Sequence, residues 1–192
     1  MKSRKKGKLI IFSAPSGSGK TTIVKELMKQ VPNLAFSVSA CSRPPRRGEV
    51  DGKDYFFISV EEFRKKIEEH AFVEWEEVYK DRLYGTLVAE VERMRNKGTH
   101  VLFDVDVLGG MNIKAVFGMA ALSIFVQPPS VEELRSRLEM RGSDSKEDID
   151  IRVEKAEFEL TFAENFDVIV VNDRLDDAVK EVVTLVTEFL SE

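Results

Sequence analysis

Residues 8–22 read KLIIFSAPSGSGKTT, a short apolar run followed by a Pro/Gly-rich turn and a Lys-Thr-Thr segment. The β-branched and aromatic residues of the run favour a strand, and the residues from Lys20 onward favour a helix. Between them, Gly17 and Gly19 let backbone N–H groups crowd around an anion at the helix N-terminus. The stretch therefore predicts a phosphate-binding loop, which indicates a nucleotide but not a reaction.

Within this loop, Lys20 would reach the β- and γ-phosphates of the nucleotide, and Thr21 would bind Mg²⁺. A strict G-x-x-x-x-G-K-[ST] pattern has glycine where this chain has Ala14. The alternative is a Gly/Ser turn with a solvated lysine, but the strand before it and the helix after it disfavour that interpretation. The predicted ATP-binding residues of the loop are Ala14, Pro15, Ser16, Gly17, Ser18, Gly19, Lys20, Thr21 and Thr22.

The composition is typical of one compact globular domain, because 43% of the 192 residues are hydrophobic and 33% are charged. A formal charge of −5 argues against a protein that coats nucleic acid, since such binding needs many cations to neutralise phosphates. With Cys41 as the single cysteine and two histidines, an intrachain disulfide and an all-protein zinc site are excluded, and a cytoplasmic setting is predicted. The apolar run behind the basic N-terminus is too short for a signal peptide or a membrane span, so no membrane partner is expected.

Beyond the loop, most of the chain alternates predicted helices with predicted strands. Helices are expected over 20–30, 86–97, 107–117, 130–140, 146–165 and 175–190, and strands over 34–38, 100–106, 121–127 and 166–172. This alternation predicts an α/β fold with a parallel sheet covered by helices on both faces and ligands at the carboxyl ends of the strands. A segment dense in Pro, Gly and Arg interrupts it. There, a strand at 55–58, a helix at 59–70 and a strand at 72–79 predict an inserted lobe.

The Arg43-Pro44-Pro45-Arg46 segment is a second candidate site. Pro44 forces the residue before it into an extended conformation, and the two prolines favour a polyproline path with three residues per turn. Arg43 and Arg46 would therefore share a face. Two guanidinium groups on one side of a stiff segment suit a dianionic monophosphate, to which Tyr55 could add a hydroxyl. The alternative is a basic surface loop.

Two carboxylates and three arginines complete the candidate residues. Asp104 and Asp106 end an apolar strand and stand at i and i+2, so both point to one face at the carboxyl edge of the sheet, where a metal is expected. Capping of the next helix is the alternative role for Asp106. Arg137 and Arg141 lie at i and i+4 on one helix face, and Arg152 follows a polar break. Surface solvation is the alternative for these arginines.

Together these segments resemble the guanylate kinase family of nucleoside-monophosphate kinases. The resemblance is carried by SAPSGSGKTT, SVSACSRPPRRGEVDGKDYFF, FVEW, LYGT, LFDVD, RLEMRG and VIVVND, in that order over about residues 8–173. It implies a Mg²⁺-dependent, direct transfer of the ATP γ-phosphoryl group to GMP. It also implies a core at 8–35 and 87–192, an inserted GMP-binding lobe at about 36–86 and a helical lid at about 137–152. The family commonly has alanine at the position of Ala14.

The resemblance further implies residue roles at the acceptor site. Glu74 would read guanine, whose N1–H and N2–H₂ donors lie side by side for one carboxylate, whereas adenine has an acceptor at N1. The other implied GMP-binding residues are Ser39, Arg43, Arg46, Tyr55, Tyr84, Thr86 and Asp106. Between Trp75 and Tyr84 the chain has one residue more than the family pattern, which leaves the register of Tyr84 and Thr86 open.

On the donor side, the resemblance implies that Asp104 holds Mg²⁺ through a water molecule and that Asn172 contacts the adenine of ATP. The implied catalytic residues are Lys20, Arg43, Arg137, Arg141 and Arg152. Phosphoryl transfer is catalysed mainly by positioning and charge stabilisation, and arginines on a mobile lid supply both while excluding water.

Two alternative functions follow from the same resemblance. Guanylate-kinase-like domains of scaffold proteins bind protein ligands without catalysis, but the presence of Lys20, Thr21, Arg43, Arg46 and Arg152 favours an enzyme. An enzyme with AMP or a pyrimidine monophosphate as acceptor is the other alternative, and Glu74 is the feature that argues against it. The expected partners are ATP and GMP, and the oligomeric state is left open.

Overall fold

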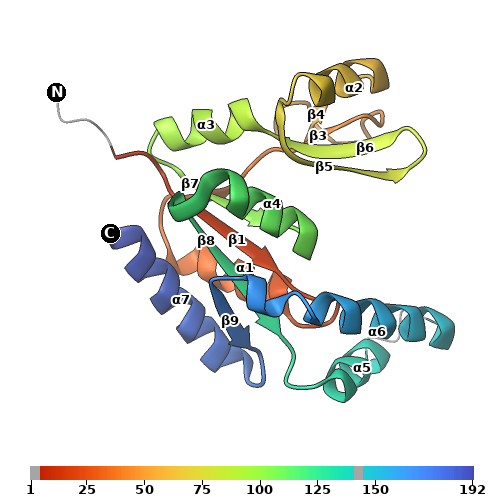
Figure 1. Cartoon of the computed structure of the whole chain (residues 1–192), viewed down its shortest axis with the longest axis vertical. Helices are drawn as coiled ribbons and strands as arrows, with labels where there is room; N and C mark the ends of the chain where they lie inside the picture. Colours follow the sequence, from red (N-terminus) through yellow and green to blue (C-terminus); the bar gives the residue numbers. More distant parts are fainter. Residues whose placement is uncertain (1–4, 141–144) are drawn as a thin grey trace.

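The computed structural model describes residues 5–140 and 145–192. Within them the chain forms a five-stranded parallel sheet, the core sheet, with the strand order β2-β7-β1-β8-β9 (Figure 1). Its strands are β1 (Leu9–Ser13), β2 (Leu34–Phe36), β7 (His100–Asp104), β8 (Ala121–Gln127) and β9 (Val168–Val171). The phosphate-loop strand β1 lies in the middle of this sheet, between β7 and β8.

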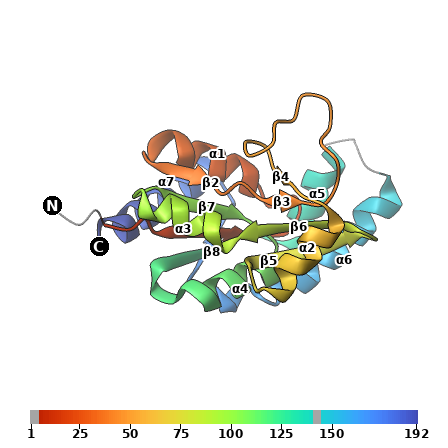
Figure 2. The same ribbon diagram turned by 90° about the horizontal axis from the view of Figure 1, so that it is seen from above.

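Helices cover both faces of the core sheet, and β1 is therefore buried on both sides. Ile10 and Phe12 pack against α1 and α7, whereas Leu9 and Ile11 pack against α3 and α4. These helices are α1 (Lys20–Gln30), α3 (Val88–Asn96), α4 (Val107–Phe117) and α7 (Leu175–Ser191). Figure 2 shows α1 and α7 on one side of the sheet and α4 on the other. The predicted α/β fold with a doubly covered parallel sheet is confirmed.

A second, mixed sheet of four strands lies apart from the core sheet, at the upper right of Figure 1. Its order is β4-β3-β6-β5, with β3 (Ala40–Cys41), β4 (Phe56–Phe57), β5 (Phe72–Tyr79) and β6 (Arg82–Leu87). Helix α2 (Val60–Glu68) covers it through Phe63, which is fully buried and stacks on Phe72 at 4.3 Å between ring centroids. As expected from the sequence, Ser59 caps α2, because its Oγ accepts a hydrogen bond from the N–H of Glu62 at 3.1 Å.

Strands β3 and β6 of this smaller sheet were not predicted, and β6 corrects one predicted helix boundary. The sequence pattern predicts a helix from Thr86, but β6 continues through Leu87 and α3 begins at Val88. Thr86 and Leu87 pair with Glu74 and Phe72 of β5 across the antiparallel ladder. Tertiary strand pairing therefore overrides the local helical preference at these two positions.

Helices α5 (Val131–Met140) and α6 (Lys146–Leu160) pack against each other beyond the strand ends, at the lower right of Figure 1. Leu134 and Leu138 of α5 pack against Ile149 and Val153 of α6. The helix expected over 146–165 ends at Leu160, and a 3₁₀ turn, η2 (Ala163–Asn165), follows; another, η1 (Gly118–Ala120), follows α4. The predicted lid residue Arg141 lies outside the described residues. In the part of the chain that the structure describes, no helix is long and apolar enough to cross a membrane.

Candidate active site

The phosphate loop joins β1 to α1 through two glycines in left-handed conformations. Gly17 has φ 94° and Gly19, the residue before α1, has φ 92°, a region that other residues adopt at a cost. The loop forms the floor of the donor cavity, which has a volume of about 400 Å³. Its lining comprises Ala14, Pro15, Ser16, Gly17, Ser18, Gly19, Lys20, Thr21, Thr22, Asp104, Val105, Asp106, Arg152, Lys155 and Glu159. All nine predicted loop residues therefore line one cavity.

Lys20 is directed at the end of strand β7. Its ammonium group forms an ion pair with the carboxylate of Asp104 and donates to the carbonyl oxygen of Val105 at 3.2 Å. Phe12 of β1 pairs with Asp104 of β7, so the parallel register brings the carboxylate beside the loop. The donor cavity thus contains an ion pair in which a phosphate or a cation could replace either partner.

Asn172 lies beneath the loop and is 5% exposed. Its side-chain amide donates to the carbonyl oxygen of Ser18 at 2.7 Å, and a Cβ added at Gly19 would lie 2.2 Å from the amide nitrogen. Arg137 donates to the carbonyl oxygen of Asn172 at 3.1 Å and pairs with Glu133 at 2.9 Å. Neither Asn172 nor Arg137 is part of the described lining of the donor cavity. Both instead connect the loop to its supporting elements, and the adenine contact of Asn172 stays a prediction.

One face of α6 overhangs the loop. Arg152 donates to the hydroxyl of Ser16 at 3.2 Å, and Lys155 and Glu159 follow it at i+3 and i+7. The Glu159 side chain is 9% exposed, and burial raises the pKa of its carboxyl although Lys155, 3.8 Å away, acts in the opposite direction. Lys155 and Glu159 were not among the predicted residues, but their helical spacing from Arg152 is a signal that could have found them.

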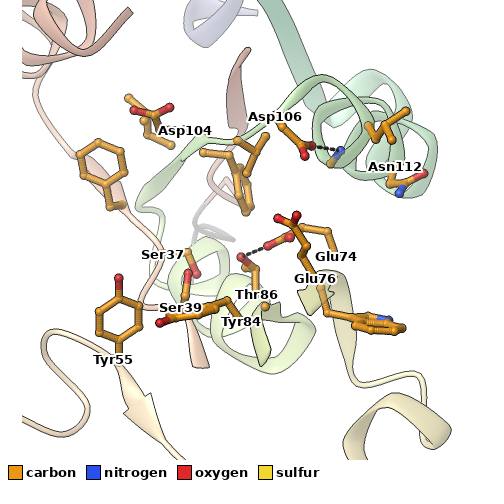
Figure 3. A pocket seen from close by; sticks show the side chains of 18 residues that line it. Ser37, Ser39, Tyr55, Glu74, Glu76, Tyr84, Thr86, Asp104, Asp106 and Asn112 are labelled. Carbon is orange, nitrogen blue, oxygen red and sulfur yellow. Dashed lines mark hydrogen bonds between the residues drawn. The ribbon is translucent and has the colours of Figure 1, made fainter. Parts of the chain in front are cut away.

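A second cavity of about 580 Å³, the acceptor cavity, lies between the core sheet and the smaller sheet (Figure 3). Glu74 and Thr86 face each other across β5 and β6, and the Thr86 hydroxyl donates to Oε1 of Glu74 at 2.6 Å. Burial raises the pKa of Glu74, the charges of Asp106 and Glu76 add to this effect, and the Thr86 hydrogen bond opposes it. A half-buried carboxylate thus faces a cavity that can hold a planar base.

The antiparallel pairing of β5 and β6 places Tyr84 and Thr86 opposite residues of β5. Glu74 pairs with Thr86 and Glu76 pairs with Tyr84, whereas the ladder shifts between Glu77 and Tyr79. The ladder is thus irregular near the hairpin end, and the register of Tyr84 and Thr86 relative to the family pattern stays a prediction. Tyr84 and Thr86, two residues apart, both line the acceptor cavity.

Other predicted acceptor residues reach the same cavity from separate elements. Ser39 and Tyr55 line it beside Tyr84 (Figure 3), and the Tyr55 and Tyr84 rings meet edge to face at 6.0 Å. Ser37 also lines it and was not predicted; its hydroxyl is buried and has no hydrogen-bond partner among the described residues. The alternation of Ser37 and Ser39 after β2 could have indicated a shared face.

Asp106 caps helix α4, which was the alternative role considered for it. Its Oδ1 accepts from the N–H of Gly109 at 2.7 Å, and the strand expected to reach residue 106 ends at Asp104. Asp104 and Asp106 nevertheless line both cavities, so the end of β7 is the point where the two cavities meet. Capping and facing a ligand are therefore compatible for Asp106.

Arg43 and Arg46 were expected to share one face of the segment, but in the structure their side chains lie in different environments. The Arg43 side chain is 8% exposed and forms two hydrogen bonds with Glu49, whereas Arg46 is exposed. In the described structure neither arginine is part of the acceptor-cavity lining. A turn from Arg46 to Glu49, in which the N–H of Glu49 donates to the Arg46 carbonyl oxygen at 3.1 Å, ends the polyproline path.

Comparison with known proteins shows the family of this chain. The family model described as guanylate kinase matches residues 6–189. The chain belongs to the guanylate kinase family. A guanylate kinase of Bacteroides thetaiotaomicron is 59% identical over 185 residues, which cover 96% of this chain and 91% of that protein. A guanylate kinase of Porphyromonas gingivalis is 51% identical, with coverage of 96% and 98%.

The fold has the same counterpart among solved structures. The crystal structure of guanylate kinase from Anaplasma phagocytophilum superimposes with a TM-score of 0.70 at 28% sequence identity, over 98% of this chain and 89% of that one. The resemblance inferred from the sequence motifs is thereby confirmed over nearly the whole chain. The roles of individual side chains stay predictions.

Proposed function

We propose that this protein transfers the γ-phosphoryl group of ATP to GMP, giving ADP and GDP. The observation that carries this conclusion is the meeting of two cavities at Asp104 and Asp106, one over a phosphate loop and one beside Glu74. Membership of the guanylate kinase family supports the same reaction. Two adjoining sites allow a donor phosphate and an acceptor phosphate to be aligned without a covalent intermediate on the protein.

On the donor side, we propose that backbone N–H groups of the loop between Ser16 and Thr22 hold the ATP phosphates at the N-terminus of α1. Lys20 would exchange Asp104 for the β- and γ-phosphates and follow the charge of the migrating group. Arg152, already in contact with Ser16 of the loop, would stabilise the same charge. Arg137 and Arg141 are proposed for the closed lid, although Arg141 lies outside the described residues.

On the acceptor side, we propose that Glu74 accepts hydrogen bonds from the N1–H and N2–H₂ groups of guanine. The Thr86 hydroxyl donates to one oxygen of Glu74 and so orients the carboxylate before the base binds. The remaining proposed GMP ligands are Ser39, Arg43, Arg46, Tyr55, Tyr84 and Asp106. A carboxylate already held in place loses little entropy on binding, which favours selectivity.

The donor cavity fits a Mg²⁺ ion, because it contains oxygen donors of the kind that this hard cation prefers. The Thr21 hydroxyl and the Asp104 carboxylate line the cavity from α1 and β7, and we propose that Thr21 binds the ion directly and Asp104 through water. Bound Mg²⁺ neutralises charge on the phosphate oxygens. Chelation of the ion is expected to stop turnover, and full activity in excess EDTA would contradict this assignment.

We further propose that the lobe at about 36–86 and the lid at about 137–152 close over the bound nucleotides. Arg46 is exposed and outside the acceptor cavity in this structure, so it must move to reach a phosphate. Closure also removes water that would compete for the γ-phosphate. Small-angle scattering should detect a smaller radius of gyration with a bisubstrate analogue, and an unchanged radius would count against closure.

The experiment that tests the function is a coupled assay of ADP release with GMP, AMP, CMP and UMP as acceptors. We expect GMP to be phosphorylated and kcat/KM for AMP to be lower by about 10⁴ or more, because the N1 acceptor of adenine would face a carboxylate. Comparable rates with AMP would overturn the guanine assignment. Absence of turnover with every acceptor would favour the alternative of a binding module.

A further inference from the structure

Glu49 was not among the predicted site residues, yet its carboxylate holds the arginine segment together. Its two oxygens accept from Nη1 of Arg43 at 2.6 Å and from Nη2 of Arg43 at 2.7 Å. The oxygen bonded to Nη1 also accepts from the backbone N–H of Arg46 at 2.6 Å. Gly48, with φ 92°, completes the turn that returns Glu49 to the two arginines. One carboxylate therefore positions parts of both arginines.

The Arg43–Glu49 pair is enclosed by the smaller sheet and its loops. The exposed fractions of the two side chains are 8% for Arg43 and 21% for Glu49. The guanidinium carbon of Arg43 lies 5.1 Å from the centre of the Tyr55 ring and 5.6 Å from that of Phe57. The bonds to Arg43 lower the pKa of Glu49 to about 2, so this carboxylate stays ionised at physiological pH. The pair is therefore a doubly hydrogen-bonded ion pair next to Tyr55, which lines the acceptor cavity.

The N–H donors of Arg43 that do not bond to Glu49 indicate which edge of the guanidinium could bind a ligand. Glu49 occupies the terminal edge of the guanidinium, and Nη1 also donates to the carbonyl oxygen of Pro44 at 3.1 Å. The guanidinium also interacts with the side chain of Tyr84, which lines the acceptor cavity, but the buried Nε–H group has no hydrogen bond of acceptable geometry among residues 5–140 and 145–192. A buried donor without a partner is costly, and the edge containing Nε is the second side from which a guanidinium can bind an oxyanion.

We propose that Glu49 is a positioning residue for the acceptor phosphate. By occupying the terminal edge of Arg43, it leaves the Nε edge as the side that can bind the phosphate once the proposed closure of the lobe brings the arginine segment to the acceptor cavity. By holding the Arg46 backbone, it fixes the position from which the Arg46 side chain extends. The inference rests on the proposed role of Arg43 in GMP binding. Glu49 itself touches no substrate.

The contrasting interpretation is that Glu49 is a stand-in for the phosphate, which GMP must displace from Arg43. The bond from Glu49 to the Arg46 backbone and the unpaired Nε favour positioning, because a stand-in needs neither. The two interpretations predict opposite effects of neutralising the carboxylate. Loss of a positioning group weakens GMP binding, whereas loss of a competitor strengthens it.

The test compares GMP with guanosine, which lacks the phosphate, by calorimetric titration of the Glu49→Gln variant. We expect Kd for GMP to rise at least about tenfold, the effect of one lost charge-assisted hydrogen bond, and Kd for guanosine to change less than about twofold. Glu68→Gln, which changes an exposed glutamate on α2 of the same lobe, is the matched control and should leave both values unaltered. Tighter or unchanged GMP binding would overturn the proposal, as would an equal loss for guanosine, which indicates general distortion of the lobe.

A double-mutant cycle with Arg43→Ala separates this inference from the proposed function. If Glu49 acts mainly through Arg43, Glu49→Gln weakens GMP binding much less in the Arg43→Ala background than in the wild type, and the remaining loss is its effect through the Arg46 backbone. Unaltered GMP affinity in Arg43→Ala would contradict the proposed role of Arg43. A large effect of Arg43→Ala with none of Glu49→Gln would contradict only the role of Glu49. Should Glu49→Gln not fold, Glu49→Asp, which keeps the charge but shortens the reach, is measured against the same expectations.

Discussion

The donor and acceptor cavities of this protein are built in different ways. The donor cavity takes its floor from one uninterrupted segment, residues 14–22, whose backbone N–H groups we propose as phosphate ligands. The acceptor cavity takes side chains from several segments between residues 36 and 112, and its polar side chains are mainly carboxylates and hydroxyls. Under the proposed roles, the difference teaches that local backbone shape suffices to hold a phosphate, which every nucleotide carries. Recognition of a particular base needs side chains that only tertiary pairing brings together.

The largest expected effect breaks the donor side. Lys20→Ala should lower kcat by at least about a thousandfold while leaving the fold intact, because it removes the charge that follows the migrating phosphoryl group. Steady-state kinetics with ATP and GMP measure this effect. Lys29→Ala is the matched control, since Lys29 lies on the same helix and forms an exposed ion pair with Glu26. Turnover within about tenfold of the wild-type value in folded Lys20→Ala would contradict the assignment of the loop.

The next effect separates the two cavities. Glu74→Gln replaces one acceptor oxygen by an NH₂ group that would face a guanine donor, so kcat/KM for GMP should fall at least about a hundredfold. KM for ATP should change little, because the donor lies on the phosphate loop. Kinetics with each substrate varied in turn measure both values. Unchanged GMP kinetics would mean that Glu74 is a surface carboxylate, and an equal rise in KM for ATP would mean that the cavities are not independent.

A smaller effect tests how far the donor loop depends on its backbone. Gly19→Ala introduces a Cβ at φ 92° and 2.2 Å from the Asn172 amide, so we expect a loss of about 2–4 kcal/mol of unfolding free energy. Gly48→Ala has the same φ of 92° with no heavy atom within 4 Å of the added Cβ, and should cost only about 1–2 kcal/mol. Urea unfolding of both variants measures the difference. Equal losses would show that the contact between Gly19 and Asn172 adds nothing.

The smallest expected effect concerns the pH dependence of the acceptor side. Burial raises the pKa of Glu74 in the folded state, so the folded protein binds this proton more tightly than the unfolded chain. The stability contributed by protonation is fully present below the unfolded pKa of about 4.5 and is lost as pH rises through the folded pKa. The melting temperature of the wild type should therefore fall relative to that of Glu74→Gln between pH 4 and pH 7. A difference that does not vary with pH would contradict the raised pKa.

Elements with strong local signals were predicted closely. Helices over 20–30 and 107–117 and the strand over 121–127 have the bounds expected from the sequence, because apolar periodicity, turns and caps lie within each segment. Strands β3 and β6 were missed, since β3 has only two residues and β6 reads LYGT in part, with a glycine that weakens a strand signal. Because β6 was missed, the helix was expected from Thr86, whereas α3 begins two residues later, at Val88.

Site residues divide in the same way. The loop residues and the location of Asp104 beside them follow from the order of a strand, a turn and a helix in a parallel sheet. Lys155 and Glu159 were missed although they share a helix face with Arg152. Glu49 was missed because nothing in the spacing of RPPRRGE indicates which arginine a carboxylate will hold. The turn at Gly48 decides that contact.

By itself the sequence determined the phosphate loop, the alternation that produces a parallel sheet and the family to which the chain belongs. The loop and the alternation depend on conformational preferences and capping, which act over a few residues, and the family follows from motifs that can be read directly in the sequence. The tertiary structure alone decided that Glu74 meets Thr86, that Arg43 is held by Glu49 rather than paired with Arg46, and that Asp104 and Asp106 join two cavities. Strand pairing and burial set these contacts, because they bring together groups that are far apart in the chain and remove them from water. Once removed from water, each carboxylate and guanidinium group needs a nearby partner of opposite charge or a hydrogen-bond partner.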